Sequence, residues 1–106
     1  MDLKFPSVRL LSDLVSYQEG SVVSHEIVAK PTGTITIFAF AEGQGLSEHK
    51  TPYDGFVYII DGEAEIKISG KNYHLKTGGT IITPANEPHA LKAVKPFKML
   101  LVMVRS

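Results

Sequence analysis

Short apolar runs separated by turn residues follow one another along most of this 106-residue chain. Glycine, proline or asparagine interrupts the runs about every 8 to 12 residues, which is typical of an all-β sandwich or barrel. The run from Glu63 to Ser69 places Ala64, Ile66 and Ile68 on one face and charged side chains on the other. Since a strand with one buried face has this period of two, the pattern predicts a fold built from short strands.

Other runs predict how individual strands are covered and connected. In the run 34–41, Phe38 and Phe40 share one face of a strand. The run 56–60 is apolar on both faces, as expected of a strand covered on both sides, and Asp61-Gly62 after it predicts a hairpin. A single helical turn is expected near the N-terminus, with Ser12 as its N-cap.

The run from Phe97 to Arg105 is almost entirely apolar. Because an exposed strand of this kind promotes aggregation, both of its faces are expected to be covered. The barrel covers one face. We expect a second subunit to cover the other, which predicts a homodimer; the alternative is that the N-terminal segment covers it.

Charge and composition argue against several classes of function. Eleven basic and eleven acidic side chains cancel, so neither nucleic acid nor an anionic membrane is favoured as a partner. The absence of cysteine excludes disulfides, thiolate metal sites and cysteine nucleophiles. No apolar run approaches the roughly 20 residues that span a bilayer, and the N-terminus has no apolar leader. We therefore expect a cytoplasmic protein.

Residues 43–62, with the sequence GQGLSEHKTPYDGFVYIIDG, resemble the first motif of the cupin family, G-x5-H-x-H-x3-E-x6-G. His49 and both bounding glycines occupy matching positions. In metal-binding cupins this motif supplies two histidines and a glutamate as ligands. Here Thr51 stands at the second histidine position and Gly55 at the glutamate position. The resemblance thus implies a site that has lost two ligands.

Residues 78–93, with the sequence GGTIITPANEPHALKA, resemble the second cupin motif, G-x5-P-x-G-x2-H-x3-N. Gly78, Pro84 and His89 match it, and Asn86 replaces its middle glycine. Asparagine tolerates a left-handed backbone better than most residues, so this replacement is mild. In metal-binding cupins the histidine of this motif is the fourth ligand.

The two motifs together imply one cupin domain over residues 1–106, with an N-terminal arm at 1–20 and a core at 34–104. The implied fold class is all-β. It is a double-stranded β-helix, or jelly-roll barrel, with at most one short N-terminal helical turn. The strand pattern predicts the same class independently.

Two histidines remain from the ligand set that the resemblance implies. His49 and His89 should face each other inside the barrel, where two neutral imidazoles can begin a site for Zn, Ni, Fe or Mn. Because a mononuclear catalytic site usually has three protein ligands, a third must come from elsewhere. His25 is the candidate, and Asp54 is a weaker one because it is one residue out of register. The alternative is that the two histidines hydrogen-bond to a ligand, to water or to each other.

Strand parity also predicts the walls of a pocket beside these histidines. A barrel with glycine in place of a glutamate gains space for a small, largely apolar molecule with one or two polar groups. The predicted pocket-lining residues are Thr51, Gly55, Val57, Ile59, Phe38, Phe40, Tyr53, Leu91, Met99 and Met103.

Three functions are compatible with such a site. The one we favour, because two ligand positions are lost, is binding of a small molecule by a cupin with a degenerate two-histidine metal site. The second is a metal-dependent enzyme of the dioxygenase, isomerase or decarboxylase type, using His49, His89 and an unidentified third ligand. The third is a non-catalytic dimeric structural or interaction module. The fold alone does not decide among them, and the sequence does not identify a ligand.

Overall fold

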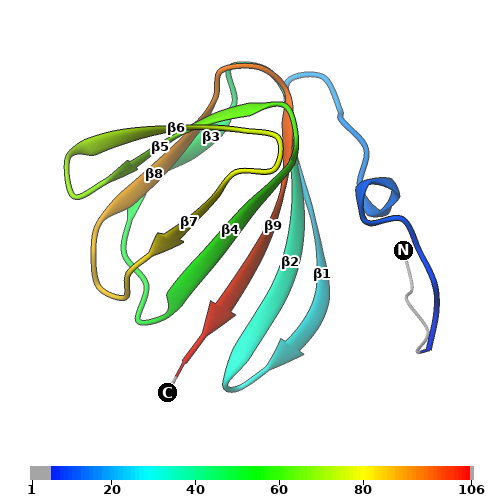
Figure 1. Cartoon of the computed structure of the whole chain (residues 1–106), viewed down its shortest axis with the longest axis horizontal. Helices are drawn as coiled ribbons and strands as arrows, with labels where there is room; N and C mark the ends of the chain where they lie inside the picture. The colour runs from blue at the N-terminus through cyan, green and yellow to red at the C-terminus, as the bar shows by residue number, and fades with distance from the viewer. Residues whose placement is uncertain (1–5, 106) are drawn as a thin grey trace.

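The computed structural model describes residues 6–105, and within that range it is built almost entirely from strands (Figure 1). The elements are η1 (Leu11–Leu14), β1 (Val22–Lys30), β2 (Gly33–Phe40), β3 (Gly45–His49), β4 (Asp54–Asp61), β5 (Glu63–Ile68), β6 (Lys71–Lys76), β7 (Thr80–Thr83), β8 (His89–Ala93) and β9 (Phe97–Val104). The all-β prediction is confirmed. No helix among these residues is long and apolar enough to cross a membrane.

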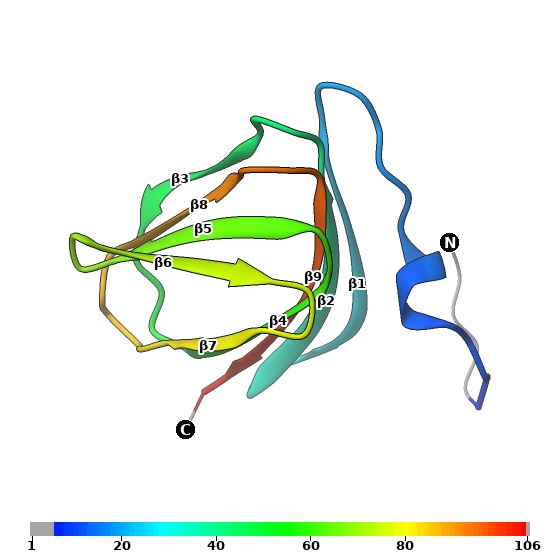
Figure 2. The same ribbon diagram turned by 45° about the horizontal axis from the view of Figure 1, so that its top comes forward.

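The strands form two sheets that face each other across one core (Figure 2). One sheet has the order β1-β2-β9-β4-β7, and the other has the order β3-β8-β5-β6. Neighbouring strands are antiparallel in both. From β2 onward every connection except that between β5 and β6 crosses from one sheet to the other, which makes the jelly-roll barrel that the sequence predicted.

The turn at Asp61-Gly62 is not the hairpin that the dipeptide predicted. β4 and β5 lie in different sheets, so Gly62 turns the chain around a corner of the barrel. Its φ is +86°, and a Cβ at this position would overlap the carbonyl oxygen of Pro96. The dipeptide does signal a left-handed turn, but local turn chemistry does not determine whether the flanking strands pair.

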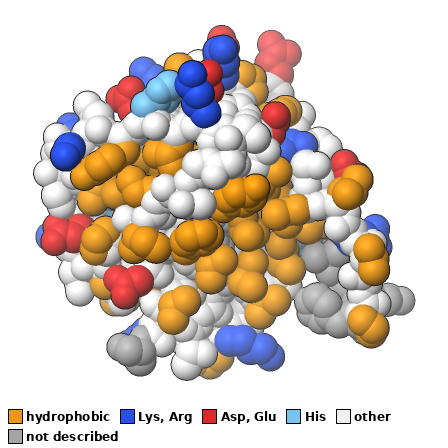
Figure 3. Space-filling view, viewed as in Figure 1, with side chains coloured by type: hydrophobic (Ala, Val, Ile, Leu, Met, Phe, Trp, Pro, Cys, Tyr) orange, Lys and Arg blue, Asp and Glu red, His pale blue; other side chains and the backbone are white. Residues whose placement is uncertain are grey.

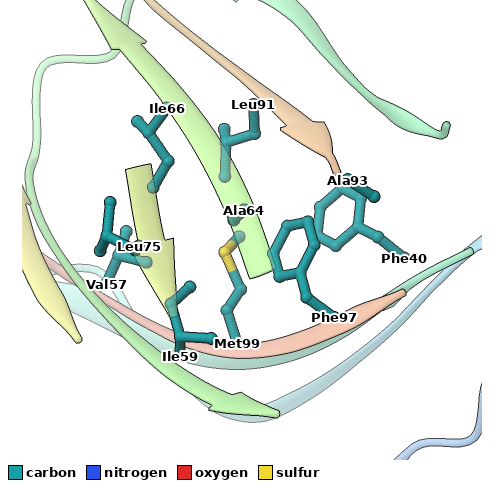
Figure 4. Close-up of a cluster of buried hydrophobic side chains, with 10 residues drawn as sticks. All are labelled: Phe40, Val57, Ile59, Ala64, Ile66, Leu75, Leu91, Ala93, Phe97 and Met99. Carbon is teal, nitrogen blue, oxygen red and sulfur yellow. The ribbon is translucent and has the colours of Figure 1, made fainter. Parts of the chain in front are cut away.

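The main core fills the space between the two sheets (Figure 4). Its buried side chains are Phe40, Val57, Ile59, Ala64, Ile66, Leu75, Leu91, Ala93, Phe97 and Met99. The rings of Phe40 and Phe97 stack, with centroids 4.4 Å apart. The alternation predicted for β5 is confirmed. Ala64 and Ile66 are buried, whereas Lys67, which lies between Ile66 and Ile68 in the sequence, is exposed.

A second, smaller cluster lies on the outer face of the five-stranded sheet. There Leu14 and Val15 of the N-terminal segment pack against Ile37 and Ala39 of β2, and the segment runs outside β1 (Figure 2). Ser12 is not the N-cap of η1: Leu10 holds that place and makes no side-chain cap. Leucine has no side-chain oxygen, so the turn owes its stability to packing instead.

Polar contacts fasten the N-terminal segment to this face. The Lys98 ammonium donates to the Ser12 carbonyl at 2.7 Å and lies 5.1 Å from the centroid of the Tyr17 ring. The Tyr17 hydroxyl donates to the Asp61 carboxylate at 2.5 Å. Partial burial, together with the bond to Asp61 and its negative charge, raises the pKa of Tyr17. The segment therefore covers the end of the outer face next to Asp61 and Lys98.

Candidate functional site

A cavity of about 180 Å³ opens into the barrel between the two sheets. Most of its wall is apolar, and its polar groups are two imidazoles and two threonine hydroxyls. The lining residues are Phe38, Leu46, His49, Thr51, Val57, Thr83, His89, Leu91, Met99, Leu101 and Met103. Six strands and the segment after β3 contribute to this wall, so the cavity exists only once both sheets have formed.

His49 and His89 lie side by side in this wall. His49 ends β3, His89 begins β8, and the two are cross-strand partners. Their ring centroids are 4.3 Å apart and their ring planes are inclined at 62°. His89 is buried and His49 is exposed. The pairing of β3 with β8 therefore brings together two histidines that are far apart in the sequence, as the sequence predicted.

Backbone carbonyls orient both imidazoles in the same way. The Nδ1 atom of His49 lies 2.7 Å from the Ser47 carbonyl oxygen, and that of His89 lies 3.1 Å from the Glu87 carbonyl oxygen. A carbonyl oxygen only accepts hydrogen bonds, so each neutral ring carries its proton on Nδ1 and a lone pair on Nε2. Neither Nε2 has a protein hydrogen-bond partner among residues 6–105.

Thr51 lines the cavity but is not on a strand with His49, because β3 ends at His49. Its hydroxyl is engaged locally: it accepts from the Tyr53 amide at 3.3 Å and donates to the Tyr53 carbonyl at 3.2 Å. The position that carries a ligand in metal-binding cupins is here used to close a turn. Its oxygen is therefore a weak candidate for a metal ligand.

Gly55 does not line the cavity, contrary to the prediction. It is buried beneath Thr83, whose hydroxyl donates to the Gly55 carbonyl at 3.4 Å. A Cβ on Gly55 would overlap this hydroxyl and would lie 3.4 Å from a methyl group of Leu101. The space that a glutamate side chain would need is thus occupied by Thr83, so the glycine leaves less room than its size implies.

We expect Gly55→Ala to lower the free energy of unfolding by about 1–3 kcal/mol, the usual cost of overpacking a filled core. In a Thr83→Ala background the penalty should shrink, because the remaining contacts of the new Cβ would be of ordinary length. Urea denaturation of the wild type, both single variants and the double variant measures this coupling. Equal penalties in the two backgrounds would show that Thr83 does not occupy the space.

The predicted pocket residues fall into two groups. His49, His89, Phe38, Thr51, Val57, Leu91, Met99 and Met103 lie in the cavity wall. Ile59 and Phe40 do not line the cavity, and both are fully buried in the main core. Tyr53 also lies outside the wall, and the Arg105 guanidinium sits 5.9 Å from the centroid of its ring.

His25 does not lie in the cavity wall with His49 and His89, so it is not placed to be a third ligand. It pairs with Ile37, and Ile37 faces the N-terminal segment on the outside of the sheet. Cross-strand partners share a face, so His25 points away from the barrel interior. Its buried Nε2 has no hydrogen-bond partner among residues 6–105. Asp54 is also occupied elsewhere, because its carboxylate accepts from the Ala85 amide at 2.8 Å.

Three wall residues, Leu46, Thr83 and Leu101, are missing from the predicted set, although Leu101 shares a strand face with Met99 and Met103. Leu46 precedes an irregularity in the pairing of β3 with β8, which breaks the parity that would have related it to His49. Thr83 lies opposite Gly55 in the pairing of β4 with β7. The periodicity of a single strand cannot predict which residue of another strand lies opposite.

The donor set supplies only half of a four-ligand metal site. Among residues 6–105 no group of three or more His, Cys, Asp or Glu side chains is placed to hold a metal ion. Two Nε2 lone pairs fit two coordination positions, whereas a mononuclear catalytic centre usually takes three protein ligands. The residues present therefore do not fit a complete catalytic metal centre.

Comparison with known proteins finds a matching family model and solved structures with the same fold. A family model described as "Cupin domain" matches residues 36–104. A conserved protein of unknown function from Streptococcus pyogenes superposes with a TM-score of 0.93 at 36% identity, covering 98% of this chain and 91% of that one. A cupin superfamily protein from Desulfitobacterium hafniense superposes with a TM-score of 0.92 at 26% identity, covering 100% of this chain and 97% of that one.

Two other relatives are longer than this chain. A cupin 2 conserved barrel domain protein from Leptotrichia buccalis is 43% identical with a TM-score of 0.88, covering 90% of this chain and 46% of that one. Among curated proteins, the polyketide synthase CurC of Streptomyces cyaneus is 26% identical over 68 residues, covering 63% of this chain and 44% of that protein. The chain therefore spans less than half the length of either.

Proposed function

This chain belongs to the cupin superfamily, and we propose that it binds a small, largely apolar molecule in the cavity beside His49 and His89. The observation that carries this proposal is an apolar wall bearing two imidazoles whose Nε2 atoms lack protein partners. The cavity volume of about 180 Å³ is close to that of engineered apolar cavities of ~150 Å³ that bind benzene. A ligand with the bulk of a single six-membered ring therefore fits.

The polar part of the ligand follows from the orientation of the imidazoles. An Nε2 lone pair accepts a hydrogen bond, so the complementary ligand carries a donor such as a hydroxyl group. Leaving a buried acceptor unpaired costs about 1–3 kcal/mol, which disfavours ligands that offer only acceptors. Phenol, anisole and benzene have similar rings, and phenol alone among them carries a hydroxyl donor.

Binding of these three compounds can be compared by following backbone amide signals in NMR titrations. We expect phenol to shift signals of Leu91, Met99 and Leu101 in the cavity wall. We expect it to bind about 5-fold more tightly than anisole, which corresponds to one hydrogen bond. The preference should disappear in His89→Ala. His74→Ala is the matched control, because His74 is an exposed histidine whose partner is Glu63.

Two outcomes would contradict the proposal in different ways. If no compound shifts the signals of the cavity wall, the cavity is not a binding site. If phenol and anisole bind equally well, the cavity binds ligands but the Nε2 atoms do not select them. Loss of the phenol preference in His74→Ala as well would point to a general effect of removing a histidine.

A metal-dependent enzyme is the second candidate. The observation that favours it is the bond from each Nδ1 to a carbonyl, since histidine ligands of metals usually donate their other N–H in this way. Such an enzyme would need a further ligand beyond His49 and His89, which a substrate would have to provide. Metal analysis of protein purified without affinity resin tests it. Stoichiometric metal that is lost in both His49→Ala and His89→Ala would favour this candidate over simple binding.

A further inference from the structure

A β-bulge in the edge strand β1 turns one charged side chain toward the inside of the barrel. The pairing of β1 with β2 shifts between Glu26 and Val28, so that Ile27 is an extra residue. Counted from the turn that joins the two strands, uninterrupted pairing would place Ile27 opposite Thr36 and turn Glu26 outward. Instead Glu26 pairs with Thr36, and Ile27 packs in the smaller cluster on the outer face. Bulges often re-aim a side chain beside a functional site.

Glu26 stands in the same cross-strand row as two residues of the cavity wall. From β1 to β4 the successive partners in this row are Glu26, Thr36, Leu101 and Val57. Leu101 and Val57 line the cavity, and cross-strand partners share a face of the sheet. Glu26 therefore lies on the inner face, where it carries the only charge among the described residues of this sheet.

The inner face of β1 lies open beside the cavity. β1 is the last strand of a five-stranded sheet, and the sheet opposite has only four strands (Figure 2). Glu26 is accordingly exposed and Thr36 is half-buried. Since neighbouring strands lie about 4.8 Å apart, the backbone of Glu26 lies about 10 Å from that of Leu101. The glutamate side chain and a short chain on a ligand can together bridge this distance.

A buried hydroxyl group on the same side of the barrel also lacks a partner. Thr34 pairs with Met103 of the cavity wall, so its side chain faces the same way. Its Oγ1 has no hydrogen-bond partner among residues 6–105. The side of the cavity formed by β1 and β2 thus offers unused polar groups, whereas most of the wall is apolar.

Other charged side chains near the cavity are balanced or engaged. Glu48 and Lys50, at the end of β3, carry opposite charges. Glu26 takes part in neither of the ion pairs found among residues 6–105. Three further side chains are engaged by a backbone amide, a hydroxyl group and an aromatic ring, respectively: Asp54, Glu87 and Arg105.

The rest of the protein supplies no field of one sign that would select a charged ligand. Eleven basic and eleven acidic side chains cancel. On the face shown in Figure 3, charged side chains of both signs are scattered around the margin. Because exposed charges are screened within about 10 Å at ordinary salt concentrations, the charge preference of the cavity is set by the side chains nearest to it.

We infer that Glu26 selects a ligand that carries an ammonium group on a short chain beside its ring, an inference that rests on the proposed function. The ring occupies the apolar cavity, and its hydroxyl group donates to an imidazole Nε2. The ammonium group lies over Thr36 and pairs with Glu26. The ligand class is therefore that of small phenolic amines. A carboxylate in the same place would be repelled by the carboxylate of Glu26.

Three para-substituted phenols with the same two-carbon chain test this inference in NMR titrations. Tyramine ends in an ammonium group, 3-(4-hydroxyphenyl)propionate ends in a carboxylate, and 4-ethylphenol has no charged group. We expect tyramine to bind about 4-fold more tightly than 4-ethylphenol, the size of one exposed ion pair. The propionate should bind more weakly than 4-ethylphenol. The advantage of tyramine should shrink at about 1 M salt, where the Debye length is only ~3 Å.

Glu26→Gln removes the charge and keeps the size of the side chain. Tyramine and 4-ethylphenol should bind this variant equally well, and the affinity for 4-ethylphenol should not change. Glu65→Gln is the matched control, because Glu65 is an exposed glutamate of β5 that lies between two residues of the main core and so points away from the cavity. It should keep the preference for tyramine.

Equal binding of tyramine and 4-ethylphenol to the wild type would overturn the inference, as would a preference for tyramine that persists in Glu26→Gln. Tighter binding of the propionate would overturn it as well and would point to Arg105 instead. These outcomes leave the proposed function intact, because 4-ethylphenol still binds in the cavity. If phenol and 4-ethylphenol both leave the signals of the cavity wall unshifted, the proposed function fails and this inference fails with it.

Discussion

Gly62→Ala is expected to lower the free energy of unfolding by more than about 4 kcal/mol, which is exceptional for a single substitution. Two effects add at this position. The φ of +86° is unfavourable for any residue with a Cβ. In addition, the new Cβ would overlap the Pro96 carbonyl oxygen and lie 2.9 Å from the Cβ of Phe97. Backbone atoms cannot move aside as a side chain can, so the corner between the two sheets would have to open.

Gly70 provides a matched control for this prediction. Its φ is +84°, but a Cβ there would meet nothing within 4 Å. Gly70→Ala should therefore cost only the conformational penalty, about 1–2 kcal/mol. The difference between the two variants in urea denaturation isolates the contact with Pro96. Similar penalties for both variants would show that the corner accommodates a side chain, contrary to the packing described here.

Phe97→Ala is expected to cost about 3–5 kcal/mol, the usual penalty for truncating a fully buried aromatic side chain. Phe97 is completely buried and stacks on Phe40 across the pairing of β2 with β9. A loss of about 4 kcal/mol corresponds to a decrease in Tm on the order of 15–30 °C in a domain of this size. Thermal unfolding followed by circular dichroism measures it.

Phe97→Leu is the graded comparison for this prediction. Leucine keeps a branched apolar side chain and leaves a smaller cavity, so its penalty should be clearly lower than that of alanine. A double-mutant cycle with Phe40→Ala would report the interaction of the two rings, expected at about 0.5–1.5 kcal/mol beyond the area they bury. A Phe97→Ala variant as stable as the wild type would contradict the placement of this ring in the core.

At two positions that carry ligands in metal-binding cupins, this chain uses the space or the side chain for packing and hydrogen bonding instead. Thr83 fills the place beside Gly55, and Thr51 closes a turn through the backbone of Tyr53. Restoring a glutamate at position 55 would therefore require removal of Thr83 as well. Each of the two remaining histidines is held in orientation by the carbonyl of the residue two positions before it, so their geometry does not depend on the missing ligands.

The sequence by itself determined the local properties of this protein. Alternation along β5, the turn residues and the two motifs were sufficient for the all-β barrel and for the proximity of His49 to His89. These properties depend on strand periodicity and on motif register, which are readable within single segments. The same reasoning failed at Asp61-Gly62, because a turn signal does not specify the sheet to which the next strand belongs.

Only the tertiary structure decided which residues meet across strands. His25 lies outside the barrel because it pairs with Ile37, and Thr83 lies in the cavity wall because β7 pairs with β4. Strand pairing depends on contacts between residues distant in the chain, and a shift of one residue exchanges the two faces of a strand.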